Sequence, residues 1–171
     1  MVSLEPFEKC DYSRLISWVD TAETLLQFAG PAFSFPLTVD QLDESCSNPA
    51  RMCFKLVLTN SGQVIGHSEI YLLEGTGWLG RILIGDPSQR GQGLGGHTVK
   101  ALLQLCFERL ICEEVRLNVF DRNRSAIRCY ERCGFTVNAD ARFQRTVGEQ
   151  VWIGRQMMLL KKDWNQLRLA K

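Results

Sequence analysis

Four glycines fall within six positions in the middle of the chain, in the segment Arg90-Gly91-Gln92-Gly93-Leu94-Gly95-Gly96. A β-rich run ends shortly before this segment, and an amphipathic helix is expected directly after it, over 94–110. Glycine has no Cβ, so this backbone can adopt positive φ and approach a ligand closely. The first turn of the helix presents unpaired N–H groups and the positive end of its dipole. The segment therefore predicts a cradle for a phosphate or diphosphate.

The elements expected around this loop favour an α/β fold in which helices cover both faces of one mixed, mostly antiparallel sheet. Alternating or apolar runs predict strands over 2–7, 52–59, 63–72, 78–84, 114–120, 142–147 and 151–160. Periods of three and four residues predict helices over 11–29, 94–110 and 123–133, with a short helical turn over 39–45. The length of 171 residues suits one domain, 1–171.

Charge and composition exclude several classes of function. Twenty Lys and Arg stand against nineteen Asp and Glu, so nothing favours a nucleic acid or a membrane surface as partner. The acidic N-terminus lacks a signal peptide's apolar stretch, and the apolar runs are short of the ~20 residues of a membrane span. We therefore expect a cytoplasmic protein. Seven cysteines without a C-x-x-C pair, and only two histidines, predict reduced thiols and no metal site.

A dinucleotide site is one alternative for the loop. Gly91, Gly93 and Gly96 fit G-x-G-x-x-G, and Asp121 ends the next strand, where a ribose-binding acid could stand. Against it, residues 86–90 separate the glycines from their strand, and the elements that follow are too few for a doubly wound sheet. A P-loop does not fit, because no Lys follows the glycines.

A second reading rests on two motifs. The segment R-G-x-G-x-G after a D-P turn resembles the acyl-CoA pyrophosphate loop of the GNAT superfamily of N-acetyltransferases. The family's downstream string, L-x-V-x-x-x-N-x-x-A-x-x-x-Y-x-x-x-G-F, is matched without a gap by Leu117, Val119, Asn123, Ala126, Tyr130, Gly134 and Phe135. The two motifs span 82–135. The amino-acid sequences of these motifs further resemble the branch of the superfamily that contains ribosomal-protein N-terminal acetyltransferases and spermidine acetyltransferases.

The resemblance implies a single-domain GNAT-like fold whose sheet opens beside the strand that precedes the loop. Acetyl-CoA would be the cosubstrate, without a metal. The strand would offer backbone groups to the pantetheine arm from Ile82, Leu83, Ile84 and Gly85. The pyrophosphate would lie among Arg90, Gly91, Gly93, Gly95 and Gly96. Asn123 would bond the coenzyme, cap its helix or do both. Gly85 departs from the family, which often has Val or another apolar residue there.

Tyr130 matches the family's general acid, which protonates the leaving thiolate; its alternative is a core aromatic. An alkylamine with a pKa near 10.4 is neutral in only ~1 molecule in 10³ at pH 7, so a proton acceptor matters. Glu69 is the candidate base, which would receive the proton of the amine through water. Its alternative is an exposed polar position on a strand. His67 lies on the same strand face and is the next candidate.

The acceptor should lie against the first helix and the segment that follows it. An aromatic slot could be walled by Phe28, Phe33, Phe35 and Leu37, and a cationic amine attracted by Asp40, Asp43 and Glu44. These residues could equally form a small apolar cluster and a solvated acidic turn.

The function predicted from these motifs is direct transfer of an acetyl group from acetyl-CoA to a primary amine in a ternary complex. Polyamines, small-molecule amines and protein N-termini are all open as acceptors. The alternatives are a non-catalytic acyl-CoA sensor and, less favoured, a dinucleotide-dependent oxidoreductase. The closing hairpin could pair with a second copy in a homodimer.

Overall fold

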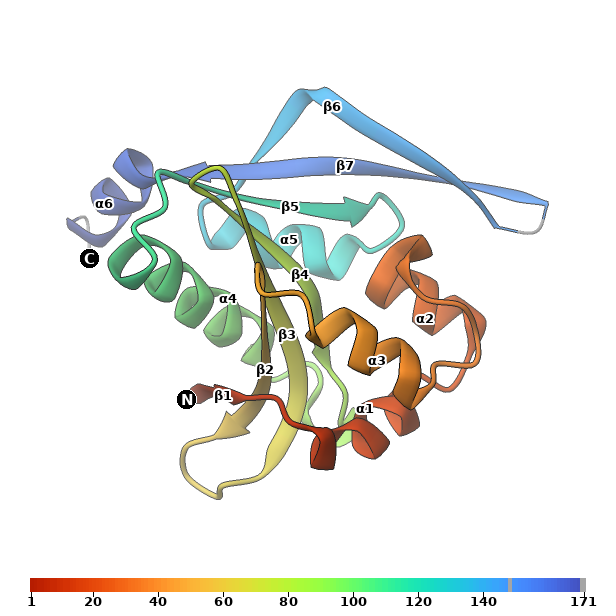
Figure 1. Ribbon diagram of the computed structural model, residues 1–171. Helices are drawn as coiled ribbons and strands as arrows, with labels where there is room; N and C mark the ends of the chain where they lie inside the picture. The colour runs from red at the N-terminus through yellow and green to blue at the C-terminus, as the bar shows by residue number, and fades with distance from the viewer. Residues whose placement is uncertain (148, 170–171) are drawn as a thin grey trace.

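The computed structural model describes residues 1–147 and 149–169. Seven strands form one mixed sheet in the order β1-β2-β3-β4-β5-β7-β6 (Figure 1). Their bounds are β1 Val2–Pro6, β2 Arg51–Leu58, β3 Val64–Leu73, β4 Thr76–Ile84, β5 Glu114–Phe120, β6 Thr136–Val147 and β7 Gln150–Leu160. Among the described strands only β4 and β5 pair in parallel. This confirms the predicted fold class and excludes the doubly wound sheet of the dinucleotide alternative.

Helices cover both faces of the sheet (Figure 1). On one face, α4 (Leu94–Gln104) continues into a π-helical turn, Leu105–Arg109, and packs with α5 (Arg124–Arg132) in the main core. On the other face, α1 (Tyr12–Trp18), α2 (Ala22–Ala29) and α3 (Val39–Cys46) enclose a second cluster. Each fully buried Leu or Val side chain contributes roughly 1.5–3 kcal/mol of transfer free energy. No helix among the described residues is long and apolar enough to cross a membrane.

Three elements differ from the sequence prediction. The helix expected over 11–29 is two helices, because Thr21 leaves helical geometry and its side chain caps α2 by accepting from Thr24 N at 3.0 Å. The apolar period continued across this break because both helices pack on the same cluster. β6 begins at Thr136, before the predicted 142, and α6 (Lys161–Leu169) was not predicted.

The sheet opens between β4 and β5, as the resemblance implied. Their parallel pairing is limited to Thr76–Leu79 against Glu114–Leu117. Beyond it, β5 stays with β7 while β4 stays with β3, and the register of β3 and β4 shifts between His67 and Glu69. Figure 1 shows the two strands diverging from their shared end. The edge of β4 from Gly80 to Ile84 therefore has no β5 partner.

Candidate active site

The glycine loop leaves a run of amide groups unpaired at the start of α4. Gly91 and Gly93 have φ values of 78° and 77°, in the left-handed region that glycine adopts without strain. The Gly96 amide donates to the Gly93 carbonyl at 2.9 Å. Within the described chain, no acceptor takes a hydrogen bond from the amides of residues 91–95. These amides, at the positive end of the α4 dipole, suit a diphosphate.

α5 packs beside the loop at Gly95 and Gly96, and this packing would also accept a Cβ. A Cβ at either position would lie in ordinary contact with Cys129 Sγ, at 3.7 Å and 3.9 Å. Arg90 connects the same loop to the end of β4, because its Nε donates to the Ile84 carbonyl at 2.9 Å and its Nη2 to the Gly85 carbonyl at 3.0 Å. Two of its donors thus hold the loop in place.

Gly85 has a different environment from the one we predicted. Its amide donates to the Ile65 carbonyl at 2.8 Å, so this N–H is committed to β3 and is not available to pantetheine. The indole ring of Trp18 fills the space that a Cβ of Gly85 would need. The departure from the family's usual residue therefore has a packing cause. Ile82, Leu83 and Ile84 lie beyond the last β4–β5 pair, where the resemblance requires them.

A cavity of about 500 Å³ lies where the strands diverge. Its walls come from β2, β4, β5, α5, β6, β7 and the end of α2 with the turn that follows it. Ile82, Asn123 and Tyr130 line it together, although they come from three different elements. The other residues predicted for catalysis or coenzyme binding, among them Glu69 and the glycine loop, do not line it. This volume is typical of a small-molecule site.

Asn123 and Tyr130 are positioned by α5. The Asn123 side chain caps the helix, since its Oδ1 accepts from the Ala126 amide at 3.2 Å. The Tyr130 ring packs edge-on against Phe135, with 6.0 Å between centroids. Burial, with smaller contributions from Cys129 and Cys133, raises the pKa of Tyr130 above its usual value of 10. The phenol therefore keeps its proton at neutral pH, as a general acid must.

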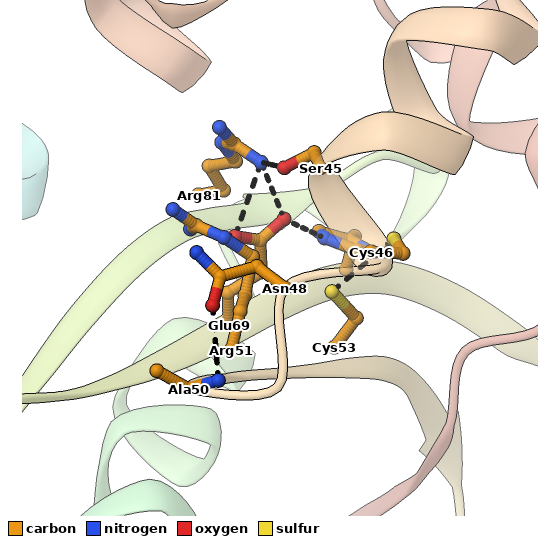
Figure 2. Close-up of polar contacts among 9 residues, drawn as sticks. Ser45, Cys46, Asn48, Ala50, Arg51, Cys53, Glu69 and Arg81 are labelled. Atoms are coloured by element: carbon orange, nitrogen blue, oxygen red, sulfur yellow. Dashed lines mark hydrogen bonds and ion pairs between the residues drawn. The ribbon is translucent and has the colours of Figure 1, made fainter.

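Glu69 lies between two arginines (Figure 2). Its side chain is 1% exposed, its Oε2 is 2.5 Å from Arg51 Nη1, and its Oε1 is 2.9 Å from Arg81 Nη1. Burial alone would raise its pKa, but the hydrogen bond from His67 and the charges of Arg81 and Arg51 lower it to about 2. Such a carboxylate is a very weak base. Neither predicted interpretation fits, because the residue is neither exposed nor suited to take a proton near neutral pH.

His67 does not line the cavity either, although it packs against Phe28, which does. Its ring is 1% exposed, with Nε2 3.1 Å from Glu69 Oε1 and edge contacts to Phe7 and Phe28. Its Nδ1 is buried without a hydrogen-bond partner in the described chain. His67 is therefore buried behind the cavity wall and does not face an acceptor amine there.

The predicted acceptor segment is only partly at the site. Phe28 lines the cavity, and Phe33 lies under the guanidinium of Arg81, 4.0 Å from its ring centroid. Leu37 is in the second core cluster, and Phe35 is 49% exposed. The three acids do not line the cavity, and Asp43 pairs with Lys9 at 2.8 Å. The expectation that Asp40, Asp43 and Glu44 attract the amine there is not supported by their position.

Four arginines in the cavity wall were missed in the sequence. They are Arg51 on β2, Arg81 on β4, and Arg142 and Arg145 on β6. One signal was available: Arg81 interrupts the apolar run of its strand. The other three stand at ordinary strand positions, and only the register of the sheet brings them to one place. The described residues contain no cluster of three metal-ligating side chains.

Known proteins share both sequence and fold with this chain. The chain is 40% identical over 76 residues to the spermine/spermidine N(1)-acetyltransferase of Bacillus subtilis, a match that covers 44% of this chain and 47% of that protein. It is 32% identical over 87 residues to an aminoglycoside N(6')-acetyltransferase type 1 of Klebsiella pneumoniae, covering 44% of this chain and 43% of that protein. The chain thus spans about half the length of the curated relatives it matches.

Solved structures resemble the whole fold. A spermidine N-acetyltransferase from Vibrio cholerae, in complex with CoA and spermine, superposes with a TM-score of 0.80 at 19% identity, over 96% of this chain and 98% of that one. An aminoglycoside acetyltransferase in complex with coenzyme A gives a TM-score of 0.75 at 20% identity, over 98% and 99%. The family model for the acetyltransferase (GNAT) family matches residues 18–135, which contain the glycine loop, the open strand edge and Tyr130. The chain belongs to the acetyltransferase (GNAT) family.

Proposed function

We propose that this protein is an N-acetyltransferase that moves an acetyl group directly from acetyl-CoA to a primary amine in a ternary complex. The observation that carries the proposal is the opening between β4 and β5, which forms a cavity lined by Tyr130. The free amides of the glycine loop follow the end of the same β4 strand and would bind the diphosphate. The unpaired edge of β4 would bind the pantetheine arm.

In the proposed reaction the amine nitrogen attacks the thioester carbonyl carbon, and the carbon–sulfur bond breaks. Tyr130 gives its proton to the leaving thiolate and recovers one from solvent. A thiol with a pKa of about 8.5 needs only a phenol within hydrogen-bond reach for this step. The attacking nitrogen loses one proton to solvent, which balances the proton that the thiolate receives.

No carboxylate or imidazole among the described residues lines the cavity, so we assign removal of the amine proton to water. An N-terminal α-amine with a pKa near 7.7–8.0 loses its proton to water easily, whereas an alkylamine does so in a small fraction of molecules. Glu69 would hold the arginines of the wall in this scheme and would not take the proton.

A thiol-release assay with acetyl-CoA tests the proposal across amines: spermidine, an aminoglycoside, small amines and peptides with free N-termini. The relatives' names make the first two natural probes. Thiol release that depends on the amine is expected. A sensor domain would instead show a melting temperature raised by acetyl-CoA with no release for any amine, and an oxidoreductase would be stabilised by NAD.

The location and the assembly of the protein are predicted from its sequence. The predicted location is cytoplasmic. The predicted assembly is a homodimer, in which β6 would pair with a second copy because it is an edge strand of the sheet.

A further inference from the structure

The wall of the active-site cavity is strongly cationic. Arg51, Arg81, Arg142 and Arg145 line it, and no carboxylate among the described residues does so. Composition does not explain this, because the whole chain carries a formal net charge of only +1. Two carboxylates contact these arginines from outside the cavity, Glu69 and Asp121, and they leave the wall with a net positive charge.

Arg51 and Arg81 are held in place by Glu69, and each keeps guanidinium N–H groups that are not hydrogen-bonded to the described chain. Arg51 and Arg81 each use Nη1 for Glu69, and Arg81 Nη1 also donates to Ser45 Oγ at 2.6 Å (Figure 2). No acceptor within residues 1–147 and 149–169 takes a bond from Nη2 of either guanidinium. Arg51 Nε is moreover buried without a partner. The Nη2 groups are therefore the donors that remain for a ligand in the cavity.

Aromatic rings fix the orientation of both guanidinium groups. Arg51 lies 5.3 Å from the ring centroid of Tyr71, and Arg81 lies 4.0 Å from that of Phe33. A planar guanidinium held in this way offers its Nη2 group in a fixed direction to a carboxylate or phosphate. The other two arginines of the wall add charge. Arg142 pairs with Asp121 at 2.6 Å, whereas Arg145 donates, among the described residues, only to the backbone carbonyl of Gln144.

The phosphates of the coenzyme do not account for this charge. They belong at the glycine loop, whose residues lie outside the cavity. The thioester end of the coenzyme is uncharged. The cationic wall is therefore directed at the other substrate.

We propose that the acceptor carries an anionic group, a carboxylate or a phosphate, in addition to its primary amine, and that Arg51 and Arg81 bind this group. The inference rests on the proposed acetyltransferase function and narrows it to one class of amine. A purely cationic polyamine or aminoglycoside would meet like charge in this cavity.

Three amines with the same two-carbon chain test the inference: ethanolamine, β-alanine and O-phosphoethanolamine, with spermidine as the cationic comparison. We expect kcat/KM for β-alanine or O-phosphoethanolamine to exceed that for ethanolamine and spermidine by at least 10-fold, as one charge-assisted hydrogen bond allows. A higher kcat/KM for β-alanine identifies the anionic group as a carboxylate, and a higher kcat/KM for O-phosphoethanolamine identifies it as a phosphate. Equal or higher kcat/KM for ethanolamine or spermidine overturns the inference.

Variants locate the effect. Arg51→Gln should raise KM for the anionic amine at least 10-fold, and this increase should exceed the change in KM for ethanolamine, which has no anionic group to lose. Arg145→Glu breaks no ion pair of the described chain, so it should fold; it should lower kcat/KM for the anionic amine and raise it for spermidine. Arg168→Gln, on α6 and paired with Glu108, is the control for loss of charge alone. An unchanged preference in Arg145→Glu and Arg51→Gln contradicts the proposal.

The same variants separate this inference from the proposed function. If no amine releases thiol, the acetyltransferase assignment fails. The anion site is then measured by the melting temperature of CoA-saturated protein with each amine. A rise with the anionic amines that Arg145→Glu abolishes supports the site, and equal melting temperatures for all four amines overturn it.

Discussion

The indole ring of Trp18 occupies the space that a side chain on Gly85 would require, so the end of β4 and the end of α1 fit only because residue 85 has no Cβ. We expect Gly85→Ala to lower the free energy of unfolding by about 2 kcal/mol, because a rigid ring cannot give way. Urea unfolding measures this. Gly80→Ala on the same strand is the control, since a Cβ there meets nothing within 4 Å.

The cause can be isolated with a double variant. Trp18→Ala removes the obstruction, so Gly85→Ala should be nearly neutral in that background, with a coupling energy of at least about 1 kcal/mol. Additive losses in the double variant would mean that Trp18 is not what excludes a side chain at Gly85.

Glu69 should stabilise the fold in a pH-dependent way. Its pKa is lowered to about 2 from 4.5, so its charged form contributes about 3 kcal/mol above pH ~4.5, and this is lost as the pH falls toward 2. Glu69→Gln should therefore lose about 3 kcal/mol at pH 7 and show a shallower acid transition. Urea titrations from pH 2 to 7 measure both. Glu113→Gln is the control, because that side chain is 81% exposed and its loss should change the free energy of unfolding little. A loss of about 3 kcal/mol in Glu113→Gln as well would contradict the stabilising role assigned to Glu69.

Tyr130→Phe should reduce kcat by about 10²-fold or more and leave the affinity for acetyl-CoA within twofold, because only the transferred proton is removed. Steady-state kinetics and calorimetric titration give the two quantities. Tyr12→Phe makes the same chemical change in the core cluster on the other face and should keep full kcat. If Tyr130→Phe kept full activity, Tyr130 would not be the general acid and would serve only as an aromatic residue in the packing.

The pH–rate profile should follow the acceptor, since none of the described cavity residues is a base that titrates between pH 5 and 8. For an alkylamine, kcat/KM should rise tenfold per pH unit from pH 6 to 9, whereas for a peptide N-terminus it should level near pH 8. A plateau at the same pH for both amines would reveal an enzymatic base instead.

The local elements were predictable from the sequence where one face of an element determines its pattern. β5 was predicted with its observed bounds, because alternate residues enter the core. The glycine loop and the Asn123 cap were also local signals. The division of the first helix at Thr21 was not found, because the apolar period passes through it.

Long-range contacts account for what the sequence could not predict. In the sequence Glu69 is a polar residue in a predicted strand. Its buried ion pairs come from Arg51 on β2 and Arg81 on β4, which the sequence does not place beside it. The cationic cavity likewise combines β2, β4 and β6, so no short motif carries it. The acids on α3 were given a role by proximity in sequence to aromatic residues, but none of them lines the cavity, and Asp43 pairs with Lys9.

The central claim is that the turn before α4 binds the diphosphate of coenzyme A through its main chain. The most direct test is to titrate ¹⁵N-labelled protein with coenzyme A and with pantetheine, and to follow the amide resonances of residues 91–95. We predict large downfield shifts of these amide protons with coenzyme A and small ones with pantetheine, which lacks the diphosphate. Saturation by coenzyme A that leaves these five amides unmoved would contradict the account.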